Sequence, residues 1–406
     1  MKKIKDIYPE VIAKENLYRS AYIASRGRRY RETVADFNFN LEKEIETLHG
    51  ELSDKSYRHG KYRVFTIYDP KERNIAAAPF RDRVVHHAVH DIIEPILDET
   101  FIYHSYACRK NRGSHKAVDK AQEFLRLNAF CFHGDIKKYF FSIDHGILKG
   151  IINSRIEDKD LLWLVNEIID SAKQLAAVDP QFTTKGLPIG NLTSQLFANL
   201  YLSELDYFVK FGLKAKFYLR YMDDVMIFGN DKAGLIGLKA KIRDFLKERL
   251  RLEIHEAKSQ IYKSKNGIKF LGFRLFKGHR RLASSNVRRF KKRLKNFAYL
   301  LENSSRHCER NEAISKRDCF TPSGFAMTGG AIRDSVRCWV AHSKYANTNG
   351  LRLTIYENLG KKKPYLSALL KGILLDNKLF REKDYYMQQM VSSDLANQKR
   401  GMYAKI

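Results

Sequence analysis

Short apolar or alternating apolar and polar segments recur along the chain, and each of them predicts a β-strand. They cover residues 62–68, 130–135, 217–221, 225–229 and 268–276, the last being one strand or a tight strand pair. The turn-forming sequence Asp-Pro-Lys-Glu-Arg at 69–73 predicts a hairpin tip. The pairing of 217–221 with 225–229 leaves an acidic turn between two apolar strands.

Apolar residues spaced by three or four positions predict helices between these strands. The helical segments are about 16–52, 82–97, 114–125, 193–209 and 235–250, with Ser114 as an N-cap. Hairpins mixed with helices predict an α+β fold with an antiparallel sheet. Beyond residue 276 the pattern is helical to about 375, except at 303–330. That stretch has no helical period and predicts an inserted surface loop.

The charge balance changes what this fold is expected to bind. The chain has 74 Lys and Arg against 46 Asp and Glu, a net charge of +28, and its 44% hydrophobic content excludes a mainly disordered chain. Such an excess favours a polyanionic partner, with nucleic acid first. A membrane is the second candidate, and we exclude it because no stretch approaches 18 consecutive apolar residues.

One segment concentrates this positive charge. Residues 277–299 contain nine Lys or Arg and no Asp or Glu. Such a run is either a solvated face or a surface that contacts phosphates, and the total charge favours the second interpretation. We therefore predict a nucleic-acid contact through Arg288, Arg289, Lys291 and Lys292.

The cysteines and the N-terminus bear on the compartment. The five cysteines form no Cys-x-x-Cys pair, and their odd number cannot pair fully within one chain. The basic N-terminus is followed by no apolar segment of a secretory signal. We expect reduced thiols and a cytoplasmic protein.

Three carboxylates are the candidates for catalysis. Asp223-Asp224 is the only Asp-Asp pair in the chain and lies at the predicted hairpin turn, while Asp135 ends another apolar strand. Successive strand residues face opposite sides, so we assign the more central place to Asp223. Three acids in one sheet would need cations to stay ionised, and two Mg²⁺ ions could hold the oxygens of a phosphoryl transfer. The alternative is a set of unrelated surface acids.

Four motifs carry a resemblance to a known family. Tyr-Met-Asp-Asp at 221–224 resembles the catalytic hairpin of reverse transcriptases, and 132–144 resembles the first palm motif of the bacterial enzymes. Residues 78–87 are similar to their fingers motif and 270–273 to the primer-grip turn. The motifs follow the family's order over about residues 60–276. The resemblance implies a right-hand polymerase with fingers, palm and a helical thumb.

A further motif narrows the resemblance. Most bacterial reverse transcriptases have Gln-Gly and Ser-Pro where this chain has Ile-Gly-Asn and Ser-Gln within 186–195. This variant, and the segment 335–348, resemble the reverse transcriptases of diversity-generating retroelements. That group copies a template-repeat RNA into cDNA with errors at adenines, which serves mutagenic retrohoming, and works with a small helical accessory protein. The 303–330 segment departs from the pattern.

The resemblance also implies residue roles at the metal site. Asp135 and Asp223 would be the main ligands of two Mg²⁺ ions, for which Mn²⁺ can substitute, with Asp224 as the third acid. The Ile136 carbonyl would help to hold the nucleotide-side ion. Phe140 would stand under the sugar and exclude a 2′-hydroxyl, although it could instead be a core aromatic.

Other residues would handle the nucleotide. Lys71 and Arg73 would close over the triphosphate of the dNTP, and Lys258 would protonate pyrophosphate as a general acid. Solvated turn or surface residues are the alternatives for these cations. A further group would lie near the templating base, comprising Ile189, Gly190, Asn191 and Gln195.

These expectations define a domain plan and leave alternatives. We predict an N-terminal extension and fingers over 1–129, a palm over 130–276, a thumb over 277–376 and a tail over 377–406. The partners would be template RNA, the cDNA or primer, and dNTPs. One alternative is another bacterial reverse transcriptase, of the intron, retron or phage-defence type. Another is a catalytically silent RNA-binding scaffold.

Overall fold

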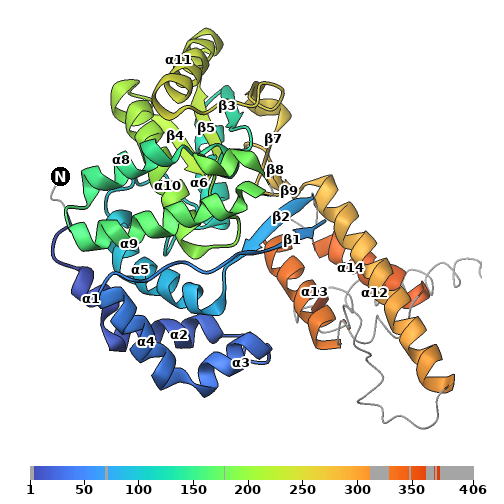
Figure 1. Ribbon diagram of the computed structural model, residues 1–406. Coiled ribbons are helices and arrows are strands. Elements are labelled where there is room, and N and C mark those ends of the chain that lie inside the picture. Colours follow the sequence, from blue (N-terminus) through green and yellow to red (C-terminus); the bar gives the residue numbers. More distant parts are fainter. Residues whose placement is uncertain are drawn as a thin grey trace, which may run out of the picture. The chain divides into compact units, whose positions relative to one another are not determined.

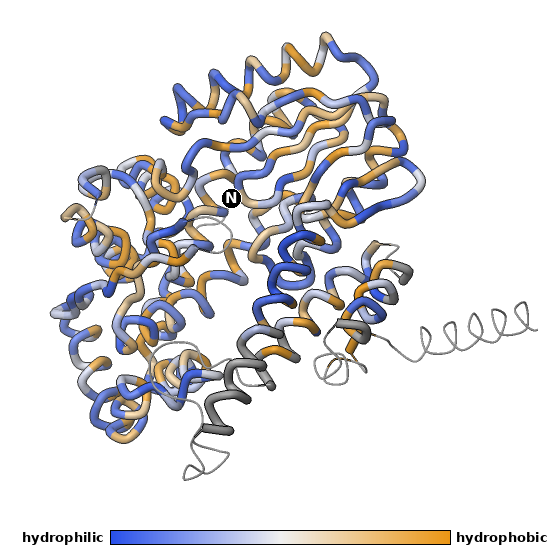
Figure 2. The backbone as a smooth tube through the Cα atoms, turned by 90° about the vertical axis from the view of Figure 1, so that its right-hand side faces the viewer, coloured by the Kyte–Doolittle hydropathy of each residue, from blue (hydrophilic) through white to orange (hydrophobic). Residues whose placement is uncertain are grey.

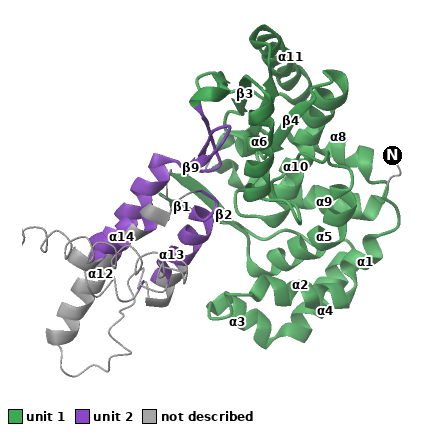
Figure 3. Ribbon diagram, turned by 180° about the vertical axis from the view of Figure 1, so that it is seen from behind, with its two compact units in different colours: residues 1–266 green, residues 267–406 purple. Residues whose placement is uncertain are grey.

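The chain forms two compact units, Met1–Asn266 and Gly267–Ile406, which are coloured separately in Figure 3. This computed structural model describes residues 4–68, 72–177, 179–310, 329–346, 349–362, 370 and 373–374. The division falls after residue 266, whereas the sequence predicted the end of the palm at 276. The expected tail at 377–406 lies outside the described residues.

Four short helices open the first unit (Figure 1). They are α1 (Tyr8–Ile12), α2 (Lys14–Ser25), α3 (Glu32–Phe39) and α4 (Leu41–Ser53). Three of them, α1, α2 and α3, pack against the longer helix α5 (Phe80–Asp98), and α4 packs against these three. The sequence predicted one continuous helical region here. Gly27 in the left-handed region, at φ +70°, lies in the turn that follows α2, and the backbone at Asn40 departs from helical geometry between α3 and α4.

An antiparallel sheet of four strands forms the centre of the first unit. Its strand order is β4 (Phe217–Tyr221), β5 (Asp224–Gly229), β3 (Phe130–Asp135) and β6 (Gln260–Lys263). The helices α6 (Ser114–Leu127) and α11 (Lys232–Leu250) pack against it. The sequence predicted β4, β5 and β3 from their apolar segments, but not the edge strand β6.

The other helices of this unit build the apolar core beside the sheet. They are α7 (Tyr139–Ser142), α8 (His145–Arg155), α9 (Lys159–Asp170) and α10 (Leu192–Tyr207), with 3₁₀ turns at Ser171–Ala177, Pro180–Thr183 and Ser264–Asn266. A π-helical turn, Phe208–Gly212, follows α10. The predicted cap at Ser114 was wrong: Ser114 is the first residue of α6 and makes no capping bond. Gly113 precedes it with a positive φ of 97°, which only glycine adopts easily.

A separate hairpin, β1 (Arg63–Ile67) and β2 (Arg73–Ala77), lies outside the main sheet. Ala76 of β2 joins a small apolar cluster with Ala172, Leu175 and Phe182. The tip of the hairpin, residues 69–71, lies outside the described residues, and with it Lys71.

The second unit begins with a three-stranded antiparallel sheet, β7 (Ile268–Phe270), β8 (Phe273–Leu275) and β9 (Arg280–Leu282). Three helices follow: α12 (Ser284–Arg310), α13 (Gly329–Ser343) and α14 (Asn349–Lys362). Their core includes Phe290, Leu294 and Val336, and the rings of Phe290 and Trp339 stack 3.7 Å apart. In Figure 2 the first turns of α12, before its grey end, are coloured mainly as hydrophilic.

The predicted loop at 303–330 begins too early. Residues 303–310 continue α12, since no proline or glycine interrupts them, and residues 329–330 already belong to α13. Residues 311–328 lie outside the described residues. Over the described part of the chain, the helices are too short or too polar to cross a bilayer.

Candidate active site

Strand pairing brings the three predicted acids to one end of the central sheet. Asp135, the last residue of β3, lies directly opposite Asp224, the first residue of β5. Asp224 also pairs with Tyr221 of β4, so Met222 and Asp223 form the two-residue turn between these strands. Met222 has a positive φ of 53°, the left-handed conformation that such tight hairpins require.

The electrostatics of Asp223 reflect this crowding. The pKa of its carboxyl is raised to about 6, mainly by burial and to a smaller extent by the negative charges of Asp224 and Asp135. A carboxyl whose ionised form is disfavoured by burial and by two like charges gains most from a nearby cation. The three acids therefore form one electrostatic group rather than unrelated surface residues.

Asp135 and Asp224, the acids on either side of Asp223, each contact another side chain of the chain. The ammonium of Lys258 lies 2.7 Å from Oδ2 of Asp135, and Nε2 of His133 lies 3.1 Å from Oδ1 of Asp224. Among the described residues, no three His, Cys, Asp or Glu side chains are already arranged to hold a metal ion. The all-oxygen donor set and the raised pKa of Asp223 nevertheless fit Mg²⁺, which would compete with Lys258 and His133 for the carboxylates.

The backbone of Asp135 is fixed from the far side. Its N–H donates to Oγ of Ser259 at 3.1 Å, and its carbonyl accepts from the N–H of His255 at 2.8 Å. Ile136, the predicted carbonyl ligand, forms an isolated bridge with Ile254 and is buried. Lys258 reaches Asp135 because the chain turns tightly between His255 and Ser259.

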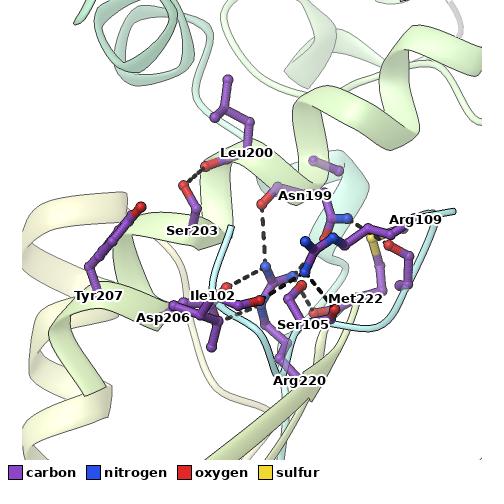
Figure 4. Close-up of polar contacts among 12 residues, drawn as sticks. Ile102, Ser105, Arg109, Asn199, Leu200, Ser203, Asp206, Tyr207, Arg220 and Met222 are labelled. Atoms are coloured by element: carbon purple, nitrogen blue, oxygen red, sulfur yellow. Dashed lines mark hydrogen bonds and ion pairs between the residues drawn. The ribbon is translucent and has the colours of Figure 1, made fainter. Parts of the chain in front are cut away.

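A buried polar network supports the hairpin turn, as Figure 4 shows. The guanidinium of Arg220, on β4, donates to both carboxylate oxygens of Asp206, on α10. It also donates to Oδ1 of Asn199 at 2.9 Å and to the carbonyl of Met222 at 3.2 Å. Tyr218 donates to the same Asp206 at 2.6 Å. Arg220 thus ties the turn residue next to Asp223 to helix α10.

Sequence reasoning missed this network. Arg220 counted there only toward the total charge, and Asp206 falls within an apolar helix. Both could have been noticed as charged residues inside segments predicted to be buried, because such residues need a partner. His133, between apolar residues of β3, gave the same kind of signal.

The residues predicted to line the nucleotide lie on two neighbouring segments. Phe140 is half-buried, and its ring meets that of Tyr139 edge-on at 5.8 Å. Phe141 instead contacts Phe182 in the small apolar cluster. Arg73 is exposed at the start of β2. The structure therefore assigns Phe140 and Phe141 to different surroundings, a distinction that the sequence alone did not provide.

The segment predicted to contact the templating base is hydrogen-bonded both to the Phe140 segment and to strand β2. The N–H of Leu187 donates to the carbonyl of Phe140 at 2.8 Å, and the N–H of Ala76 donates to that of Ile189 at 3.1 Å. Gly190 has a positive φ of 131°, and a Cβ there would lie 3.0 Å from the Ala76 carbonyl oxygen. Only glycine fits this close approach without strain.

Two polar residues of this segment differ in what they contact. Asn191 is only 5% exposed, and its amide donates to Oη of Tyr62 at 2.7 Å. The sequence had suggested that Asn191 contacts a base. Its side chain instead holds the segment in place through Tyr62. Gln195 is exposed, and its Oε1 accepts a 3.4 Å bond from the Cys108 thiol.

The predicted basic contacts lie in the second unit. Arg288, Arg289, Lys291 and Lys292 are all exposed on the first turns of α12. Phe290, Leu294 and Phe297 are buried on the opposite stripe of the same helix. The amphipathic period accounts for the exposure of the four cations.

The central sheet and its three acids define the palm of a polymerase, and comparison with known proteins gives the family. Residues 61–275 match the family described as "Reverse transcriptase (RNA-dependent DNA polymerase)". This match covers more than half of the chain, so the chain belongs to the reverse transcriptase family. Members of this family typically use divalent metal ions.

Individual relatives match over part of their length. The group II intron-encoded protein LtrA of Lactococcus lactis subsp. cremoris is 33% identical over 215 residues, which is 52% of this chain and 35% of that protein. Protein YkfC of Escherichia coli is 25% identical over 61% of this chain and 75% of that protein. The chain thus spans about a third of the length of LtrA.

Solved structures give a weaker likeness. A telomerase from Candida tropicalis, in complex with a TWJ fragment of telomeric RNA, has a TM-score of 0.43 and 12% identity to this chain. The match covers 82% of this chain and 55% of that one.

Proposed function

We propose that this chain is an RNA-directed DNA polymerase that extends a primer by two-metal nucleotidyl transfer. The observation that carries the proposal is the register of β3 and β5, which sets Asp135 opposite Asp224 with Asp223 at the adjoining turn. An RNA template, a DNA primer and dNTPs are the reactants of this chemistry. The 3′-hydroxyl of the primer attacks the α-phosphate, the bond to the β-phosphate breaks and pyrophosphate leaves.

The three acids and the Ile136 carbonyl would hold two Mg²⁺ ions, which stabilise the charge on the attacking and leaving oxygens. The raised pKa of Asp223 supports this assignment, since a dication offsets the repulsion among the three acids. Lys258 is bonded to Asp135 at 2.7 Å. If Asp135 held a metal ion, the ammonium of Lys258 would be available to donate a proton to the departing pyrophosphate.

Residues beside the acids would select the nucleotide. The half-buried ring of Phe140 would lie under the sugar, where a 2′-hydroxyl has no room, and the exposed Arg73, with Lys71, would contact the triphosphate. Ile189 and Gly190 would lie at the templating base, held by β2 through the bond from Ala76. Gln195, which is exposed, would contact the same region.

We further propose the diversity-generating retroelement type, which copies a template-repeat RNA with errors at adenines and works with a small helical accessory protein. The Ile-Gly-Asn and Ser-Gln variant of the 186–195 motif supports it. An apolar Ile189, where many relatives carry Gln, removes a polar contact near the base pair. The similarity to LtrA favours a second candidate, a reverse transcriptase of the group II intron type.

Primer extension on one defined RNA tests both the polymerase activity and the diversity-generating subtype. The wild type should make cDNA in the presence of Mg²⁺, and Asp223→Asn should not. Binding of the RNA without extension by the wild type would instead indicate a silent scaffold. For the subtype, the cDNA is sequenced with any accessory protein supplied. Errors concentrated opposite adenines, and reduced by Ile189→Gln, support it, whereas errors spread evenly over the four bases overturn it.

A further inference from the structure

A ring of polar and aromatic contacts holds the first turn of α10, directly after the segment predicted to meet the templating base. Nδ1 of His86, on α5, lies 2.6 Å from Oγ1 of Thr193, and Nε2 of His86 lies 3.2 Å from Nε2 of His59. The ring of His59 stacks on that of Tyr62, with their centres 4.6 Å apart. Tyr62 accepts the 2.7 Å bond from Asn191, two residues before Thr193, so the contacts form a closed ring.

When both histidine rings are neutral, the hydrogen bonds from Thr193 to His59 can run in one direction only. Nδ1 of His59 lies 2.7 Å from the carbonyl oxygen of Gly60, which only accepts, so this nitrogen carries the proton. Nε2 of His59 then accepts from His86, and Nδ1 of His86 accepts from the hydroxyl of Thr193. Burial is the main cause that holds the pKa of His86 well below its ordinary value, which keeps this ring neutral. Loss of the Thr193 hydroxyl would therefore leave a buried ring nitrogen without its donor.

The start of α10 gives up local stabilisation in favour of this ring. Asn191 is the N-cap residue of α10, yet its side chain makes no capping bond. Asn is among the best N-cap residues, because its side-chain oxygen can accept from the free N–H groups of the first turn. Here the side chain is used on Tyr62 instead. Such an exchange of a local bond for a distant one is typical of positions where the placement of a segment matters for function.

The ring is itself anchored to a neighbouring element. Oη of Tyr62 lies 2.8 Å from Oγ of Ser171, and the amide of Gln174 donates to the carbonyl of His59 at 3.0 Å. Both partners belong to the 3₁₀ turn Ser171–Ala177. The segment that begins at Ile189 is thus held by β2 at one end, through the bond from Ala76, and by the anchored ring at the other.

We propose that His86 and Thr193 are positioning residues for nucleotide selection, which act by holding residues 189–195 in place through this ring. The proposal rests on the proposed function, because selection of a nucleotide presupposes polymerisation beside this segment. A correct base pair is favoured when the groups around it are already held where the transition state needs them. A segment that moves more freely accommodates correct and incorrect pairs more equally, so discrimination between them falls.

The test compares Thr193→Val, which keeps the shape of the side chain without its hydroxyl, with Thr193→Ser, which keeps the hydroxyl. Single-turnover incorporation of correct and incorrect dNTPs opposite a template guanine gives the ratio of their kcat/KM values. Guanine is chosen so that errors at adenines do not mask the effect. Thr193→Val should lower this ratio about tenfold, through a lower kcat for the correct dNTP and with its KM nearly unchanged. Thr193→Ser should keep the ratio within about twofold of the wild type.

The matched control removes another buried hydroxyl from the same helix. Ser203 of α10 is fully buried and donates to the carbonyl of Leu200 at 2.6 Å, within the helix. Ser203→Ala should keep the wild-type ratio. An unchanged ratio in Thr193→Val, or an equal loss in Ser203→Ala, overturns the proposal. Circular dichroism of each variant verifies that it is folded.

A double-variant cycle tests the part of His86. Because His86 and Thr193 share one hydrogen bond, His86→Leu combined with Thr193→Val should lose about as much discrimination as the more affected single variant. Losses that multiply in the double variant would show that the two residues act independently, which also overturns the proposal.

Hydrogen exchange distinguishes failure of the ring from failure of the polymerase assignment, because it needs no activity. The backbone amides of residues 187–199 should exchange about tenfold faster in Thr193→Val than in the wild type or in Ser203→Ala. If the wild type extends primers but neither exchange nor the ratio changes in Thr193→Val, only the ring is wrong. If exchange rises as expected but the wild type extends no primer, the ring holds the segment and the polymerase assignment is wrong.

Discussion

The side chains of Arg220 and Asp206 form an ion pair with no exposed surface, in which Nε and Nη2 donate to the two carboxylate oxygens at 2.8 and 2.6 Å. Removal of one partner leaves an uncompensated buried charge. We predict that Asp206→Asn lowers the free energy of unfolding by about 3–5 kcal/mol, measured by urea denaturation.

An exposed pair provides the comparison for this effect. Lys120 and Glu123 are one helical turn apart on α6 and form an ion pair near the surface. Glu123→Gln should cost less than about 1 kcal/mol, because water screens such pairs. A similarly small loss for Asp206→Asn would show that Arg220 finds another partner and that the network does not hold the turn.

The second prediction concerns the acid at the turn. Asp223→Asn should reduce Mg²⁺-dependent primer extension at least about a thousandfold, equivalent to about 4 kcal/mol, because a metal ligand is lost. The affinity for RNA should stay nearly constant, since cations and not acids bind the backbone. Single-turnover extension and filter binding measure the two quantities. Asp244→Asn, an exposed acid on α11, should leave both unchanged.

The third prediction separates two adjacent phenylalanines. Phe140→Ala should raise the use of ribonucleotides relative to deoxyribonucleotides by at least about tenfold in kcat/KM, because the ring no longer blocks a 2′-hydroxyl. Phe141→Ala is the matched control, since Phe141 packs on Phe182 in another apolar cluster. Equal sugar discrimination in the wild type and Phe140→Ala would make Phe140 a packing residue.

The fourth prediction concerns the basic turns of α12. Replacement of Arg288, Arg289, Lys291 and Lys292 by Ala should weaken duplex binding and flatten its salt dependence by about 0.7–0.9 per lost contact. The buried stripe of the helix is untouched, so the thermal unfolding midpoint should change little. A wild-type slope in this variant would assign the four residues to a solvated face.

The fifth prediction is a pH dependence of stability. Burial lowers the pKa of His104 to about 4, with a smaller effect from Lys120 and Lys210, whereas an unfolded histidine titrates near 6.5. The unfolded chain therefore binds the extra proton between these values. The contribution of His104 to stability is complete above pH 6.5 and is lost as the pH falls toward 4.

Urea unfolding at several pH values measures this contribution. His104→Gln removes the titrating ring, so the free energy of unfolding of the variant should fall less between pH 7 and pH 5 than that of the wild type. Parallel curves for the two proteins would show that His104 has an ordinary pKa in the folded chain.

The features best predicted from the sequence were the apolar strands that end in candidate catalytic acids. The strands that carry Asp135 and Asp224 have apolar segments that predicted two strands of one sheet with acids at their ends, but their direct pairing was not predicted. The break at Gly27 and the helical start of the 303–330 segment were not predicted, because periodicity alone does not mark where a helix stops. The glycine at 27, and the absence of proline and glycine from 303–310, were the signals that could have located both boundaries.

Polar side chains that are satisfied inside the fold were harder to predict. Arg220 and Asn191 are classed by residue type as surface or ligand-binding groups, yet both are buried and bonded to residues far away in the sequence, Asp206 and Tyr62. Only the tertiary structure supplies those partners. The salt bridge of Lys258 with Asp135 also joins distant residues, 123 positions apart, but it lies nearer the surface.

The main-chain bond from Ala76 to Ile189 links the hairpin directly to the segment beside the proposed templating base. Gly190 lets the two backbones approach without an intervening side chain at this point. A shift of β2 should therefore move Ile189 as well. Substitutions in the hairpin, more than a hundred positions earlier in the chain, should consequently alter copying errors as directly as substitutions at Ile189 itself.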